Sequence, residues 1–138
     1  MKYILSVSFT LFCSYFSYSQ SLDETFDIAY SLMDEGKFGQ VLSLIEEVWE
    51  ENRIDGELIY IKSCCLLELQ RNTEADTMLR RALKMYPQNA KILDNLGRVH
   101  LNLHKHRRAI TLFNAAIDFA ESESYKYDIM MRRGIAKK

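Results

Sequence analysis

The sequence is poor in the residues that interrupt regular structure. Its 138 residues include one proline, Pro87, and five glycines. Because these two residue types are the strongest breakers of helices and strands, their scarcity favours long helices over a sheet punctuated by turns. Hydrophobic residues make up 48% of the chain and charged residues 27%, which are ordinary values for one globular domain and exclude a disordered tail. The composition predicts an all-α domain.

The sequence also lacks the motifs of common catalytic sites. It has no GxSxG nucleophile turn, no glycine-rich phosphate-binding loop and no HExxH motif. It has no CxxC motif either, and adjacent Cys64 and Cys65 would point about 100° apart on a helix, which disfavours a disulfide between them. We therefore expect a protein that is not an enzyme and that has no cofactor and no small-molecule substrate.

The first twenty residues, MKYILSVSFTLFCSYFSYSQ, have the layout of a secretory signal peptide. Lys2 precedes an apolar stretch that ends near Phe16, and the small-x-small sequence Ser17-Tyr18-Ser19 follows. The stretch is shorter than the ~18 to 20 apolar residues of a membrane span, and the alternatives are an uncleaved anchor or a buried helix. We expect removal of residues 1–19 and export to the periplasm or out of the cell.

The rest of the chain repeats itself every 34 residues, in blocks 22–55, 56–89 and 90–123. Small and large apolar residues then recur in register in four sets, namely Ala29, Ser63 and Gly97; Val41, Ala75 and Ala109; Ile45, Leu79 and Phe113; Val48, Ala82 and Ala116. A small residue in the first half of a block lets a helix in the second half approach closely. Each block therefore predicts a pair of packed helices.

A change of apolar phase separates the two helices of each pair. The third block has two stripes with helical spacing, formed by Leu93, Leu96, Gly97 and His100, and by Ala109, Ile110, Phe113, Ala116 and Ile117. Extending either stripe through residues 103–108 would place the polar segment HKHRR partly in the core. The chain must turn there without a glycine or proline, whereas the first block has Gly36 at the equivalent place.

This pattern resembles the tetratricopeptide repeat family. The matching residues are Leu93, Leu96, Gly97, Ala109, Phe113 and Ala116 in the third block, Ala75, Leu79, Ala82 and Pro87 in the second, and Ala29, Gly36, Phe38 and Ile45 in the first. Departures are Lys62, in place of a large apolar residue, and His100 and His106, in place of tyrosines. The resemblance implies that residues 20–138 form a right-handed helical-hairpin solenoid of three repeats plus a C-terminal helix.

The C-terminal segment, residues 124–138, predicts one further helix. It is either a capping helix or the first part of a truncated fourth repeat. Tyr127, Met130, Met131 and Gly134 are available to cover the end of the third pair. A polar outer face, which the ends of solenoids need, would come from four basic residues, Arg132, Arg133, Lys137 and Lys138.

The resemblance also implies a function, because first helices in this family line a concave groove that receives a peptide. The groove positions transfer to Phe26, Tyr30, Met33, Tyr60, Cys64, Leu67, Lys91, Asp94, Arg98 and Leu101. Some members grip a C-terminal carboxylate with Lys, Asn and Arg, but here Lys91 and Asn95 are the only counterparts. We therefore expect an interaction scaffold or adaptor for an apolar or aromatic protein segment, although Phe26 and Tyr60 could instead be core residues.

Two other functions are compatible with the sequence. Residues 20–60 carry 11 acidic and 2 basic residues, a net charge of −9, and residues 61–138 carry 8 acidic and 15 basic, a net charge of +7. This charge asymmetry reflects either ordinary solvation of the surface or complementary ends that favour head-to-tail homo-oligomers. The basic residues are scattered among acidic ones, so they do not indicate binding to nucleic acid. The spacing HxxxHxH at His100, His104 and His106 leaves a metal-binding envelope protein as the less favoured alternative, since no Asp, Glu or Cys in the same segment completes a site and no metal ligands are assigned.

Overall fold

The computed structural model describes residues 22–138, and this part of the chain is helical without strands, as expected. A helix over residues 22–34 is followed by α2 (Phe38–Asn52), α3 (Gly56–Glu68), α4 (Asn72–Met85), α5 (Ala90–Asn102), α6 (His106–Phe119) and α7 (Glu123–Lys137). The predicted leader, residues 1–19, lies outside the described residues. None of the helices in the described part is both long and apolar enough to cross a membrane.

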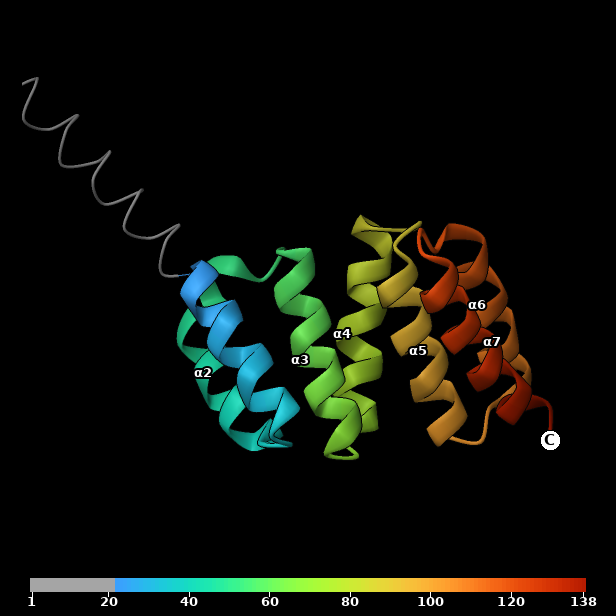
Figure 1. Cartoon of the computed structure of the whole chain (residues 1–138), viewed down its shortest axis with the longest axis horizontal. Coiled ribbons are helices and arrows are strands. Elements are labelled where there is room, and N and C mark those ends of the chain that lie inside the picture. Colours follow the sequence, from blue (N-terminus) through green and yellow to red (C-terminus); the bar gives the residue numbers. More distant parts are fainter. Residues whose placement is uncertain (1–21) are drawn as a thin grey trace, which may run out of the picture.

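The helices alternate between two layers (Figure 1). The helix at residues 22–34, α3, α5 and α7 form one layer, which we call the first-helix layer, and α2, α4 and α6 form the second-helix layer. Helices that follow one another in the chain pack together, and α3 also contacts α5, as α5 contacts α7. The result is a one-dimensional array in which each helix pair touches only its neighbours.

The turns inside the pairs share one backbone conformation at an interval of 34 residues. Gly36, Gln70 and His104 have φ angles of 73°, 59° and 58°, in the left-handed region. The next amide donates to the carbonyl five residues earlier in each case, as in the bond from Lys105 to His100 at 2.8 Å. These bonds satisfy carbonyls at the helix end and stabilise a conformation that non-glycine residues adopt rarely. The predicted turn without glycine or proline is thus present at His104.

Three helices of the first-helix layer begin with a side-chain cap. The side chains of Asp55, Asn89 and Ser122 accept hydrogen bonds from the backbone amides of residues 58, 92 and 125 at the starts of α3, α5 and α7. Such caps satisfy amides that have no partner within the helix. By this criterion α7 begins as the first helices of the preceding pairs do.

The close contact predicted for the small residue of the third block is present between Gly97 and Phe113. Phe113 is completely buried, and a Cβ atom added to Gly97 would lie 2.6 Å from its ring. Since that distance is far below van der Waals contact, position 97 requires glycine for α5 and α6 to pack as they do.

The last helix covers the third pair with a different face from the one that the sequence suggested. Ile129 and Ala136 are the buried residues of α7. Tyr127, Met130 and Met131 are 64%, 42% and 57% exposed, so the expectation that they cover the third pair is wrong. The helix is rotated about its axis relative to that expectation, because burial of Ile129 and the polar contacts of Tyr125 and Arg132 with α5 determine which face of α7 points inward.

Candidate functional site

A row of polar and aromatic side chains crosses the first-helix layer. The Tyr30 hydroxyl donates to the Glu57 carboxylate of α3. Glu57 also accepts from Lys91 Nζ of α5 at 3.3 Å, and the same Nζ lies 4.5 Å from the centre of the Tyr60 ring. Side chains from three successive first helices therefore meet on one surface.

Arg98 continues this row along α5. Its guanidinium donates to Glu68 Oε1 at 2.9 Å and to Asn95 Oδ1 at 3.2 Å, and Asn95 in turn donates to the Ser63 hydroxyl at 2.8 Å. We call the five residues Tyr30, Glu57, Tyr60, Lys91 and Arg98 the first-helix strip. It combines two aromatic rings with two cations, and its acidic group is Glu57.

The tyrosines of the strip are protonated at neutral pH. Burial is the main cause that raises the pKa of Tyr30, and its hydrogen bond to Glu57 adds to the effect. Burial also raises the pKa of Tyr60, with the neighbouring Cys64 as a further cause. Both hydroxyls therefore remain neutral groups that can donate a hydrogen bond.

The two described cysteines, Cys64 and Cys65, are free and buried. Burial raises the pKa of Cys64, and it raises the pKa of Cys65 to about 12. Because the thiolate is the reactive form, neither thiol is suited to nucleophilic or redox chemistry at neutral pH.

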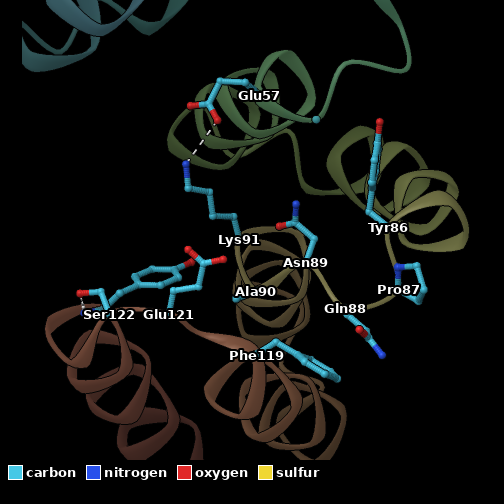
Figure 2. Close-up of a pocket in the computed structure, with 12 residues that line it drawn as sticks. Glu57, Tyr86, Pro87, Gln88, Asn89, Ala90, Lys91, Phe119, Glu121 and Ser122 are labelled. Atoms are coloured by element: carbon cyan, nitrogen blue, oxygen red, sulfur yellow. Dashed lines mark hydrogen bonds and ion pairs between the residues drawn. The ribbon is translucent and has the colours of Figure 1, made fainter.

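A pocket of about 750 Å³ adjoins the strip at the N-terminal ends of α3, α5 and α7. Glu57 and Lys91 belong to both the strip and the pocket, and Figure 2 shows them joined at one side of it. The remaining wall includes Tyr86, Phe119 and Tyr125. A bound chain could thus run along the strip and place a side chain in this pocket.

Comparison with known proteins supports this fold and matches one part of the chain to a known repeat family. The family model of the tetratricopeptide repeat matches residues 56–89, which contain α3 and α4. Among solved structures, MamA (41-end) from Desulfovibrio magneticus RS-1 is similar with a TM-score of 0.68 and 15% identity. Residues 56–89 thus match one tetratricopeptide repeat, and the chain as a whole has the fold of a helical-hairpin solenoid. Among curated proteins, no sequence matches it significantly.

Two further solved structures have similar folds. PcrH, in complex with the chaperone binding region of PopD, has a TM-score of 0.71 and 14% identity, over 85% of this chain and 88% of that chain. The P58(IPK) TPR domain has a TM-score of 0.69 and 18% identity, over 88% of this chain and 36% of that chain. The MamA match covers 83% of this chain but 63% of the MamA chain, so this chain spans less than two thirds of that relative.

Most of the groove residues predicted from the sequence lie on or near the strip. Tyr30 is 37% exposed, and Lys91 is exposed as well. Five other predicted groove residues are half-buried, because they pack partly against the core or against neighbouring side chains. They are Phe26, Met33, Tyr60, Arg98 and Leu101.

Three predicted groove residues are unavailable to a ligand. Leu67 and Cys64 are 2% and 7% exposed, because both face the interior of the array. Asp94 is 3% exposed, and its carboxylate accepts bonds from Arg132 at 2.8 and 3.0 Å and from the Tyr125 hydroxyl at 2.9 Å. The expectation that these three residues lie on the groove surface is therefore wrong, because the core of the array shields Leu67 and Cys64 and contacts with α7 cover Asp94.

Glu57 is the strip residue that the sequence analysis missed. A signal for it was present, since Glu57 and Lys91 are 34 residues apart and occupy the same position in successive blocks. Equivalent positions of adjacent first helices lie next to each other, so opposite charges there indicate an ion pair.

The histidines do not converge on one point. His100 is buried at 3% exposure, with Nε2 3.5 Å from Asp76 Oδ1, whereas His104 and His106 are exposed and their rings lie 6.1 Å apart. The described residues contain no group of three or more His, Cys, Asp or Glu side chains that could hold a metal ion.

His100 should make the stability of the solenoid depend on pH. Burial lowers its pKa below the ordinary value of 6.5, and the nearby Asp76 opposes this change only partly. The unfolded chain therefore binds the proton more readily, and the free energy of unfolding should fall as the pH drops below about 6.5. Urea unfolding at pH 7.5 and 5.5 measures this loss.

The histidine variants separate His100 from other acid-sensitive groups. We expect a smaller loss between these pH values in His100→Gln than in the wild type, and an unchanged loss in His106→Gln, because His106 is exposed. Equal losses in the wild type and His100→Gln would show that His100 is not the source.

Proposed function

We propose that this tetratricopeptide-repeat solenoid is a non-enzymatic interaction scaffold that binds a segment of a partner protein along the first-helix strip, in the cell envelope or outside the cell. The observation that carries the proposal is the strip itself, where two aromatic rings and two cations from successive helices share one surface. The solved complex of PcrH with a region of PopD supports it, since a similar fold there accommodates a protein segment.

The composition of the strip defines the segment that it would bind. An apolar or aromatic side chain would pack against Tyr30 and Tyr60, which offer large surfaces at a small entropic cost. A carboxylate of the segment would pair with Lys91 or Arg98. These cations are already paired with Glu57 and Glu68, but the acids are 36% and 45% exposed, and ion pairs at such sites contribute only about 0–1 kcal/mol. Exchange of their partners is therefore energetically easy.

The test begins with selection of binding segments from a displayed peptide library. The dissociation constants of the selected segments are then compared between the wild type and the double variant Tyr30→Ala/Arg98→Glu. We expect binding to weaken by at least about tenfold, which corresponds to about 1.4 kcal/mol and is typical of losing one anchor and one charge. Circular dichroism shows whether the variant remains helical.

A matched control removes one exposed apolar side chain and reverses one cation outside the strip. Met85→Ala/Arg81→Glu alters an exposed methionine and an exposed arginine, both on α4. The proposal predicts that this variant binds as the wild type does. If the control variant loses binding and the strip variant retains it, the strip is not the binding surface.

Self-assembly is a second candidate, favoured by the opposite charges of the two parts of the chain. The structured segment at residues 22–52 carries nine acidic residues and one basic residue, whereas residues 61–138 have a net charge of +7. Attraction between such ends weakens with salt. Sedimentation velocity at low and high salt decides the matter: an oligomer that dissociates in salt supports self-assembly, and a monomer at both salt concentrations excludes it.

A further inference from the structure

The last helix repeats the packing register of α5. A shift of 37 residues aligns Gly97 with Gly134, and it also aligns Ile92 with Ile129 and Val99 with Ala136. In α5, Ile92 and Val99 are buried, with 1% and 0% exposure. In α7, their counterparts Ile129 and Ala136 are also buried, with 0% and 3% exposure. With this register, α7 uses the same face as α5 to pack against the preceding pair.

The opposite face differs between the two helices because, among the described residues, α6 packs on this face of α5 and no helix packs on that of α7. Leu93 of α5 is 4% exposed and packs in the same cluster as Phe113 of α6, whereas its counterpart Met130 is 42% exposed. Apolar residues follow this bare face at i, i+3, i+4, i+7 and i+8, namely Tyr127, Met130, Met131, Gly134 and Ile135. This spacing is typical of a helix face that packs against a partner. We call it the α7 outer face.

The centre of the α7 outer face, at Gly134, is open space, and we call this position the seat. At Gly97, an added Cβ atom would be 2.6 Å from the Phe113 ring, whereas at Gly134 it would have nothing within 4 Å. The aligned glycine therefore provides the same opportunity for close approach, but among the described residues no side chain occupies it. A large apolar side chain of another helix would fit there as Phe113 does over Gly97.

The charges beside this seat indicate the kind of helix that would bind. The counterparts of Leu96 and His100 are Arg133 and Lys137. Arg133 donates to the neutral amide of Asn114 at 2.8 Å, and no ion pair of Lys137 is present in the described part of the chain. Two cations without acidic partners thus flank an apolar stripe, which favours a helix with acidic residues at its edges.

We propose that the α7 outer face binds an amphipathic helix of a partner protein, in the place of the second helix of a fourth repeat. A large apolar side chain of that helix occupies the seat at Gly134, and acidic side chains pair with Arg133 and Lys137. This surface is separate from the first-helix strip and gives the solenoid a second binding site of different chemistry.

Two peptides from this chain serve as probes, because both are second helices of its own repeats. The acidic probe is residues 38–52, with four acidic and no basic residues, and the basic probe is residues 72–85, with two acidic and three basic residues. Both are held helical by a staple on the polar face and carry a fluorophore for anisotropy titration against the whole protein. We expect the acidic probe to bind at least about tenfold more tightly, as complementary charges flank the seat.

The decisive variant is Gly134→Leu, which fills the seat. Leucine favours a helix over glycine and has open space at this position, so the variant should remain folded. We expect it to bind the acidic probe at least about tenfold more weakly, because the leucine side chain occupies the space that an apolar side chain of the probe would fill. Gly39→Leu is the matched control, since Gly39 is also helical and open but lies on α2, and binding should not change.

Three outcomes would overturn the proposal. The first is no binding of the acidic probe by the wild type, and the second is equal binding by the wild type and Gly134→Leu. The third is an oligomer of the protein alone, seen by sedimentation, that Gly134→Leu dissociates. In that case a second copy of the chain, and not a partner helix, occupies the α7 outer face.

Discussion

Replacement of Phe113 by alanine is expected to lower the free energy of unfolding by about 3–5 kcal/mol. The ring is completely buried, lies against Gly97 and shares its cluster with Leu93 and Ile129. Its removal therefore empties the contact between α5 and α6 and weakens the cluster that also holds α7. Since small domains have about 5–15 kcal/mol in total, this single change should remove a large part of the stability.

Urea unfolding followed by circular dichroism measures this effect. Thr111→Ala is the control on the same helix, because Thr111 is exposed, and we expect a change within about 0.5 kcal/mol. A loss below about 1 kcal/mol for Phe113→Ala would contradict the packing described for the third repeat.

Replacement of Asp94 by alanine is expected to loosen α7 from the array. The buried carboxylate accepts two bonds from Arg132 and one from Tyr125, and these are polar contacts between α5 and α7. Its loss leaves both donors without this partner, at a cost of about 1–3 kcal/mol. Because α7 lies at one end of a linear array, the loss should appear there first.

Hydrogen–deuterium exchange resolved by peptide measures where the array loosens. In Asp94→Ala, amides of residues 123–137 should exchange faster, while those of α3 and α4 should change little. Asp118→Ala removes an exposed carboxylate from α6 and serves as the control, with no expected change in α7. Unchanged exchange of α7 in Asp94→Ala would show that Asp94 does not hold the helix.

Much of the fold was predictable because repetition adds weak signals together. A single small residue such as Ala29 indicates little, but Ala29, Ser63 and Gly97 at intervals of 34 indicate a shared contact between paired helices. The turn at His104 was predictable in the same way, since its polar segment could not continue either apolar stripe. Its left-handed backbone was not, because that conformation depends on hydrogen bonds at the helix end.

The candidate site was less predictable because side-chain availability depends on contacts between repeats. Lys91 and Asp94 both occupy groove positions, yet Lys91 is exposed and Asp94 is covered by α7. Periodicity places a residue on a face of a helix but does not show which neighbour shields it. For α7 the difficulty was greater, since both of its faces carry apolar residues and only packing selects the inward one.

The most direct test of the proposed function is hydrogen–deuterium exchange of the wild-type protein with and without a segment selected from the displayed library. We expect the bound segment to slow exchange in α3 and α5, around Tyr60, Lys91 and Arg98, and to leave exchange in α2, α4 and α6 unchanged. Protection confined to the second-helix layer would contradict the assignment of the first-helix strip as the binding surface.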